Sequence, residues 1–326
     1  MEFMAKRKRR GDERKAKLEP SARVDWAVRL VKQRFLPEAE AHLRAVLREF
    51  EALGADDPVP AAKAGLVLTQ VLIQTHRAAE AESWARWTLS LRGLLDSDDI
   101  PLLAWELVPV TMVVQGRHEE AEQEFLLLTQ GLTEHGSRPL RVARARGGRA
   151  QNLVHLGRHA EAEAESRAVI AMVEQMNEPR TVNIQLLGYN GLVRALIELG
   201  RPAEAEQQAR AALARADGLA GPGARARFMV TLSLARSLVA TGRYREALST
   251  AGEAKVEFLR SGSESRGDAA AAGTVMARAL AGLGRYHEAA GEARAALTLC
   301  QETLGPGHRR IAELGEILEQ AQKNSF

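Results

Sequence analysis

The sequence of 326 residues is short of cysteine, of aromatic side chains and of long apolar runs. Its single cysteine, Cys300, excludes an internal disulfide framework and any zinc site made of several cysteines. Aromatic residues make up only 4% of the chain, which disfavours a β-sandwich or barrel, because strands are enriched in aromatic and β-branched side chains. No stretch approaches about 18 uncharged apolar residues, so we expect no membrane span and a cytoplasmic protein.

The excess of basic residues is concentrated at the N-terminus. Residues 1–20 hold eight Lys or Arg and four acids, whereas the whole chain has 45 basic and 42 acidic residues and is otherwise close to neutral. We predict a disordered tail over residues 1–20, of which residues 1–3 resemble a cloning remnant. Its basic run has three interpretations: a solvated tail without a specific role, non-specific nucleic-acid contact, or contact with a membrane surface or partner. The run consists of Lys6, Arg7, Lys8, Arg9 and Arg10.

One pattern recurs along the rest of the chain at a nearly constant spacing. A Gly-Arg pair followed by Glu-Ala occurs five times, first at residues 116–121 and last at residues 284–289, and two degenerate copies precede these. We call the alanine that ends each copy the anchor alanine. Consecutive anchors are 40 to 43 residues apart, which indicates a repeat protein built from one supersecondary unit. The anchors are Ala39, Ala81, Ala121, Ala162, Ala205, Ala247 and Ala289.

Each repeat predicts two helices separated by a tight turn. An apolar residue lies nine positions before every anchor, and small or apolar residues recur four and seven positions after it, on one helical face. The glycine supplies the left-handed residue that ends the first helix, and the acids after it favour the start of the second. We expect the anchor to be small because the two helices approach closely there. Prolines fall at predicted boundaries, except Pro109, which we expect inside a helix with a kink.

These residues resemble the tetratricopeptide repeat, whose pattern Gly-Arg/Lys-Tyr-x-Glu-Ala is matched closely at residues 242–247 and 284–289. The period exceeds the common length of about 34 residues and is similar to the longer kinesin-light-chain type. The resemblance implies an all-α, right-handed superhelical solenoid of about seven helix pairs over residues 21–323. We expect a single unit with a C-terminal capping helix over about residues 308–323. The first two repeats depart from the pattern because they lack the turn glycine.

No group of residues has the sequence spacing of a catalytic or metal site, so we expect no enzyme and no cofactor. His118, His159 and His287 come just after a turn Gly-Arg pair, and we predict exposed side chains rather than metal ligands. Clusters of acids lie in the first turns of second helices, where the helix dipole accounts for them. Cys300 has no paired histidine nearby in sequence and is interpreted as a buried or half-buried helix residue.

The resemblance also implies that the first helices of the repeats line a concave groove. Eleven positions before the anchor, three consecutive repeats carry Arg194, Arg236 and Arg278. We expect these guanidinium groups in an open, solvated groove, where they suit carboxylates, phosphates or acidic peptide segments. The alternative is that each arginine pairs with an acid on a neighbouring helix. Gly147 and Gly148 are expected to leave room in this groove. The other candidate groove residues are Arg141, Arg144, Gln151, His155 and Asn190.

The resemblance implies a non-enzymatic, bacterial scaffold or adaptor that binds a peptide or protein segment, acidic or carboxylate-bearing, in its groove. Two alternatives remain open. One is a regulator whose groove senses a peptide or anionic ligand, similar to the helical-repeat peptide sensors of Gram-positive bacteria, although the sequence has no visible helix-turn-helix effector. The other is a nucleic-acid-associated protein that uses the basic tail and the groove arginines.

Overall fold

The computed structural model describes residues 19–53, 57–176, 178, 181–216, 224–262, 265–304 and 308–324. The chain divides into two compact units, Met1–Thr111 and Met112–Phe326, and each is described by itself. That residues 21–323 form one continuous unit stays a prediction. The basic run of Lys6, Arg7, Lys8, Arg9 and Arg10 lies outside the described residues, and its role also stays a prediction.

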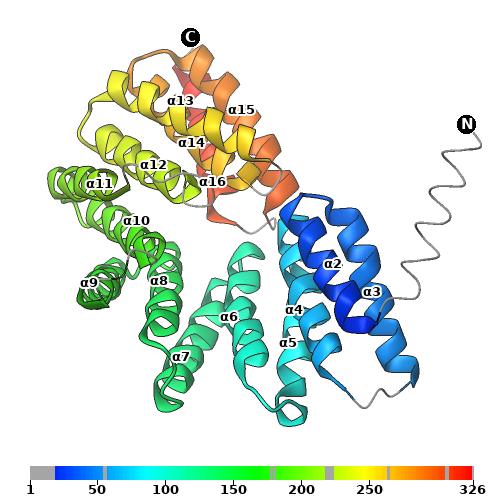
Figure 1. Cartoon of the computed structure of the whole chain (residues 1–326). Helices are drawn as coiled ribbons and strands as arrows, with labels where there is room; N and C mark the ends of the chain where they lie inside the picture. Colours follow the sequence, from blue (N-terminus) through cyan, green and yellow to red (C-terminus); the bar gives the residue numbers. More distant parts are fainter. Residues whose placement is uncertain are drawn as a thin grey trace, which may run out of the picture. The chain divides into compact units, whose positions relative to one another are not determined.

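The described residues form fifteen α-helices and one 3₁₀-helix, and they contain no β-strand (Figure 1). The α-helices follow one another as seven consecutive pairs and a last single helix, so the predicted all-α repeat solenoid is confirmed. None of these helices combines the length and the apolar character that crossing a membrane requires. The α-helices are α2 (Pro20–Lys32), α3 (Leu36–Leu53), α4 (Val59–Gln74), α5 (Ala78–Ser90), α6 (Asp99–Val114), α7 (His118–Glu134), α8 (Pro139–His155), α9 (His159–Met176), α10 (Val182–Glu198), α11 (Pro202–Ala216), α12 (Ala224–Ala240), α13 (Tyr244–Ser261), α14 (Arg266–Gly282), α15 (Tyr286–Thr303) and α16 (Arg309–Lys323), and the 3₁₀-helix is η1 (Leu91–Leu94).

The same tight turn joins the two helices of every pair. After α6, the N–H of Gly116 and the N–H that follows it donate to carbonyl groups three and five residues earlier, and Gly116 has a φ of 80°. This is a Schellman motif, in which a left-handed residue ends the helix and satisfies its last carbonyl groups. The two repeats without the glycine adopt the same turn, because Arg34 and His76 take φ values of 65° and 60°. The chain keeps this geometry even where a side chain makes it costly.

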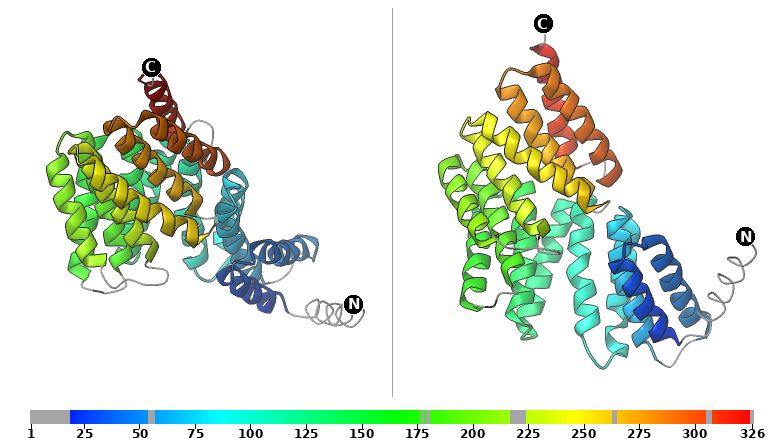
Figure 2. Two further views of the ribbon diagram at one scale, coloured as in Figure 1. Left: turned by 90° about the horizontal axis from the view of Figure 1, so that it is seen from above. Right: turned by 45° about the horizontal axis from the view of Figure 1, so that its top comes forward.

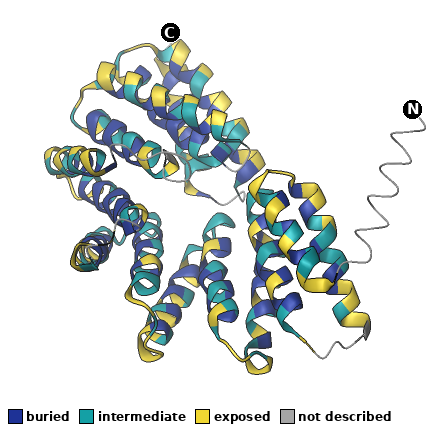
Figure 3. Ribbon diagram, in the orientation of Figure 1, coloured by how far each residue is buried: buried dark blue, intermediate teal, exposed yellow. Residues whose placement is uncertain are grey.

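The anchor alanines lie at the centre of the packing in each repeat. Buried residues follow the faces along which neighbouring helices meet, and most of them are alanine, leucine or valine (Figure 3). A larger side chain at an anchor would overlap the neighbouring helix, since protein interiors are close-packed. The anchors, all with an exposed fraction of 0%, are Ala39, Ala81, Ala121, Ala162, Ala205, Ala247 and Ala289.

In the second unit, the first helices of successive pairs lie side by side (Figure 2). Helix α8 contacts α10, α10 contacts α12, α12 contacts α14, and α14 contacts the last helix α16. The second helices α9, α11, α13 and α15 each pack both on their own first helix and on the next helix in the chain. A position repeated in each first helix therefore recurs along one continuous face of the unit.

Candidate ligand-binding site

The second unit contains a cavity of about 180 Å³ on the face formed by its first helices. Side chains of α10, α12, α14 and the start of α16 line this cavity, together with His155 at the end of α8. Two glutamates and five arginines contribute to the lining, so positive charge predominates. The arginines are Arg194, Arg236, Arg278, Arg309 and Arg310.

The three arginines at the repeated position all line this cavity. Arg194 comes from α10, Arg236 from α12 and Arg278 from α14, so each of three successive first helices contributes one. Arg194 and Arg236 are half-buried, whereas the side chain of Arg278 is 51% exposed. The two inner arginines thus differ from the expected solvated groove, because the neighbouring helices remove them from much of the water.

Arg194 is held by neutral partners instead of an acid. Its Nη1 donates to Oε1 of Gln151 at 3.0 Å, and its Nη2 lies 3.3 Å from Nε2 of His155. The same oxygen of Gln151 accepts from Nδ2 of Asn190 at 3.1 Å, and Oδ1 of Asn190 accepts from the hydroxyl of Ser233 at 2.6 Å. This polar network across α8, α10 and α12 fixes the guanidinium without neutralising it.

Arg236 has a buried donor without an acceptor. Its Nη1 has no hydrogen-bond partner among the described residues. Burial, together with the positive charges of Arg194 and Arg310, lowers the pKa of Arg236 to about 9, and burial lowers the pKa of Arg194 to about 10. Both side chains stay charged at neutral pH, in an environment that disfavours an uncompensated cation. Such a site gains most from a ligand that brings negative charge and hydrogen-bond acceptors.

Two of the three other arginines of the cavity are paired with acids, and the third, Arg310, donates to the backbone oxygen of Gly267. Nη2 of Arg278 lies 3.0 Å from Glu313 on α16, and Nη2 of Arg309 lies 3.8 Å from Glu198 on α10. The alternative of internal ion pairing therefore holds for Arg278. Among the described residues, no acid lies within ion-pair distance of the two inner arginines.

The other candidate groove residues have different places. Gln151 and Asn190 support Arg194 as described, whereas Arg141 and Arg144 on α8 are not part of the cavity lining. The expected room at the two glycines of α8 is corrected by the structure, because side chains from neighbouring helices fill it. A Cβ added to Gly147 would lie 2.8 Å from a leucine of α10, and one added to Gly148 would lie 2.8 Å from a phenylalanine of α7.

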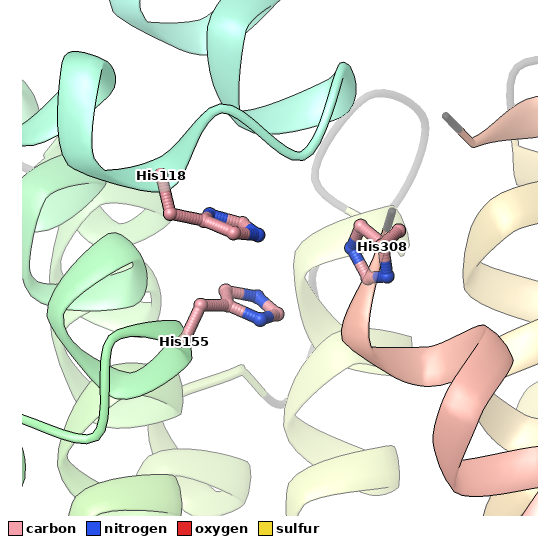
Figure 4. A group of neighbouring side chains, drawn as sticks. All are labelled: His118, His155 and His308. Atoms are coloured by element: carbon pink, nitrogen blue, oxygen red, sulfur yellow. The ribbon is translucent and has the colours of Figure 1, made fainter. Parts of the chain in front are cut away.

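The histidine side chains differ most from what the sequence predicted. His118 is half-buried rather than exposed, and its ring stacks on that of His155 with centroids 4.7 Å apart and an interplanar angle of 10°. His308, directly before α16, lies with its ring centroid 5.9 Å from that of His118 and 5.3 Å from that of His155 (Figure 4). The prediction for His118 is therefore wrong, whereas His287 is exposed as predicted and His159 is half-buried.

Sequence analysis also missed the contribution of the last helix to the cavity. His308, Arg309 and Arg310 all line it, and they form the start of α16. A signal for this was present, since α16 has no acid in its first turn and begins with two arginines. Positive charge at a helix N-terminus opposes the helix dipole, so these arginines are better explained by a site than by helix stability.

Two stretches of the chain, residues 186–222 and 270–310, match the family model described as tetratricopeptide repeat. No curated protein sequence matches the chain significantly.

Several solved structures share the fold over nearly the whole chain. A Rap protein complexed with Competence and Sporulation Factor is 13% identical, with a TM-score of 0.62, and the match covers 93% of this chain and 87% of that one. NprR in complex with its cognate peptide NprX is 14% identical, with a TM-score of 0.59 and coverages of 93% and 83%. A tetratricopeptide repeat protein from Parabacteroides merdae is 15% identical, with a TM-score of 0.59 and coverages of 93% and 98%. At these identities the likeness concerns the fold alone.

Proposed function

Because the chain is a tetratricopeptide-repeat protein, we propose that it binds a short peptide whose carboxylate enters the arginine-lined cavity of the second unit. The observation that carries this proposal is Nη1 of Arg236, a buried guanidinium donor that finds no acceptor in the described part of the chain. A carboxylate offers two acceptor oxygens and one negative charge, which is what this donor and its surroundings lack.

The charges around the cavity support an anionic ligand. Arg194 and Arg236 occupy the same position in consecutive repeats. Burial and the charge of Arg310 lower the pKa of both, and the charge of Arg194 also lowers the pKa of Arg236. An anion between them would offset both the mutual repulsion and the missing hydrogen bond. Bidentate contact with a guanidinium is also the geometry that carboxylates favour.

The size of the cavity supports a charged group rather than a whole ligand. Sites for drug-sized ligands have volumes of about 300–1,000 Å³, and the cavity of about 180 Å³ is smaller. A peptide's C-terminal carboxylate, or the carboxylate of an Asp or Glu side chain, fits such a volume. The remainder of the peptide would extend along the face formed by the first helices.

Two of the similar folds support a peptide as the ligand class. NprR was solved with its cognate peptide NprX, and the Rap protein was solved with Competence and Sporulation Factor. We therefore favour a peptide-sensing or peptide-capturing role over a general scaffold. In this proposal the repeats position a receptor site, and binding rather than catalysis is the activity.

A binding assay with two pools of short random-sequence peptides tests the proposal. One pool carries free carboxylates, and the other has C-terminal amides and lacks Asp and Glu. We expect fluorescence anisotropy to show binding of the first pool to the full chain and little binding of the second. Arg236→Met should weaken binding of the first pool by about 1.5–3 kcal/mol, roughly 10- to 140-fold, because a charge-assisted hydrogen bond is lost.

Arg243→Met is the matched control, because Arg243 lies in the same repeat but outside the cavity and is paired with Glu246 and Glu206. It removes the same charge and should leave peptide binding unchanged. Equal weakening by Arg236→Met and Arg243→Met would indicate attraction by overall charge and contradict the proposal. Equal binding of the carboxylate and amide pools would contradict it as well.

A further inference from the structure

The three histidines that meet beside the cavity form a cluster that the proposed peptide site does not use in full. His118 begins α7, His155 ends α8 and His308 precedes α16, and one ring nitrogen from each lies within 4.8 Å of the corresponding nitrogens of the other two (Figure 4). His155 and His308 also line the cavity, whereas His118 does not. We call these three residues the histidine cluster.

The proton on His118 is assigned by its neighbour Asn152, which is fully buried. Nδ2 of Asn152 donates to the backbone oxygen of His118 at 2.8 Å, so Oδ1 of Asn152 must be the acceptor in its 2.9 Å contact with Nδ1 of His118. Nδ1 of His118 therefore carries a proton, and in the neutral ring Nε2 carries the lone pair. That Nε2 is buried and has no hydrogen-bond partner among the described residues. It is a ready metal-ligand atom whose orientation is fixed by a buried amide.

The other two rings are positioned by hydrogen bonds of their own. Nη2 of Arg194 lies 3.3 Å from Nε2 of His155, and the backbone N–H of Arg310 donates to Nδ1 of His308 at 3.2 Å. Nδ1 of His155 is buried and, like Nε2 of His118, has no partner among the described residues. Because a guanidinium only donates, the contact with Arg194 leaves the proton of a neutral His155 on Nδ1, and a metal ion bound at Nδ1 would displace that proton.

We propose that His118, His155 and His308 bind a divalent transition-metal ion of the zinc class, with its fourth position open to the cavity. Three imidazoles and an exogenous ligand are a known arrangement for such ions, which prefer nitrogen donors. The proposal rests on the histidine cluster and not on the peptide proposed above.

The charges that face the histidine cluster set how the ion would bind. Arg194 lies 3.3 Å from Nε2 of His155, and Arg310 contacts His308 through its backbone N–H, which donates to Nδ1 at 3.2 Å. Both arginines repel a bare dication, so we infer that the ion binds together with an anion from the cavity as its fourth ligand. Coordination also competes with these two hydrogen bonds of His155 and His308. The affinity should therefore be lower than that of a closed structural zinc site.

Metal titrations of the full chain test this site. After treatment with a chelator and buffer exchange, the protein is titrated with Co²⁺ and, in competition with a chromophoric chelator, with Zn²⁺, each with and without acetate. We expect one equivalent of Co²⁺ to produce the intense visible bands of four-coordinate cobalt. We also expect acetate to tighten Zn²⁺ binding severalfold, because it supplies the fourth ligand. Absence of the visible bands would overturn the site, and an affinity unchanged by acetate would overturn the anionic fourth ligand.

Variants separate the histidine cluster from non-specific binding. His308→Asn keeps a side chain that can cap α16, and His118→Gln keeps a polar group beside Asn152, so both should remain folded. Each should weaken Zn²⁺ at least about 100-fold, more than the loss of an outer-shell partner of a metal ligand. His287→Ala, which removes an exposed histidine, should leave the affinity unchanged. Equal Zn²⁺ affinity in wild type and the two cluster variants would overturn the proposal.

Failure of this proposal can be told apart from failure of the peptide proposal. His118→Gln lies outside the cavity lining, so it should lose metal binding and keep binding of the carboxylate peptide pool in metal-free buffer. Arg236→Met should do the reverse, because Arg236 is not part of the histidine cluster. Retained metal binding in His118→Gln would exclude the cluster whatever the peptide result.

Discussion

Two sets of arginines recur with the repeat, and they occupy opposite electrostatic environments. The turn arginines follow the turn residue of each glycine-containing repeat and pair with the glutamate three positions later. In Arg243, for example, this hydrogen bond to Glu246 and another to Glu206 raise the pKa of the guanidinium. The cavity arginines Arg194 and Arg236 instead have lowered pKa values, because burial is not compensated by an acid. The turn arginines are Arg117, Arg158, Arg201, Arg243 and Arg285.

The difference shows that a residue type repeated with one period need not have one role. The turn arginines are half-buried or exposed, and all are paired, so each pair contributes about 1 kcal/mol or less to stability. The cavity arginines reduce stability in the absence of a ligand, since a buried charge without a partner is unfavourable. Exposed ion pairs and buried cations without an acid can therefore be distinguished by where the acids lie, which the sequence spacing alone does not reveal.

Lowering the pH should reduce the free energy of unfolding in one pH window through the histidines of the cavity and in a lower window through the acids of the turn pairs. The first of these is the largest effect we expect. His155 and His308 have folded-state pKa values below the unfolded value of about 6.5, so the unfolded chain takes up more protons as the pH falls below that value. The free energy of unfolding should thus fall by about 2–4 kcal/mol between pH 6.5 and 4.5. Denaturant unfolding at a series of pH values measures it.

The acids of the turn pairs respond at lower pH. The pKa of Glu246 is lowered by its hydrogen bond to Arg243, so its contribution is present above about pH 4.5 and is lost as the pH falls through the folded-state pKa. His308→Asn should remove part of the loss between pH 6.5 and 4.5 and leave the lower window in place. An unchanged slope between pH 6.5 and 4.5 in this variant would show that His308 is not the source.

Removing charge from the two sets should change stability in opposite directions. Arg236→Met replaces an uncompensated, half-buried cation with an apolar side chain of similar length and should raise the free energy of unfolding by about 1–3 kcal/mol without ligand. Arg243→Met breaks exposed ion pairs and should lower it by about 1 kcal/mol or less. Urea unfolding at low ionic strength compares them. The same sign for both variants would mean that the cavity does not disfavour its cation.

Each turn arginine follows a residue in the left-handed conformation. Replacing that residue should change the free energy of unfolding less than the changes described above. Gly200, directly before Arg201, has a φ of 74°, so Gly200→Ala should lower the free energy of unfolding by about 1 kcal/mol. Gly291→Ala is the matched control, because it lies within α15 and an added Cβ meets no atom within 4 Å at either glycine. It should raise stability by about 0.5–1 kcal/mol, and thermal unfolding distinguishes the two signs.

The features that could be predicted from the sequence are those that recur with the repeat. A constant period places equivalent residues on equivalent helix faces, so the anchor alanines, the helix pairs and the last helix could be predicted without a structure. The same argument predicted a shared face for Arg194, Arg236 and Arg278, and they line one cavity. Their role in binding stays a prediction. The left-handed Arg34 and His76 show that the period holds even where the turn glycine is absent.

The histidine cluster could not be predicted in this way, for a physical reason. His118 belongs to a turn, His155 to the end of a first helix and His308 to the residue before the last helix, so no common repeat position relates them. Their proximity depends on the curvature of the helix stack in the second unit. This curvature is the sum of small rotations between successive repeats. Sequence spacing specifies neighbours along the stack, and it does not specify which distant repeats meet.

The position of α16 has a consequence for how the cavity forms during synthesis. Arg309 on this helix donates to the backbone oxygen of Val154 across 155 residues of chain, and the ring of His308 lies beside those of His118 and His155, which are 190 and 153 residues earlier. Most contacts in a repeat protein are local and form quickly, whereas contacts this far apart pay a large loop-closure entropy and form late. A nascent chain can therefore stack its earlier repeats long before the cavity is complete. Residues 308–310 are synthesised after the helices that supply the rest of the lining, so a chain that stops before them would be folded in part yet lack one side of the cavity.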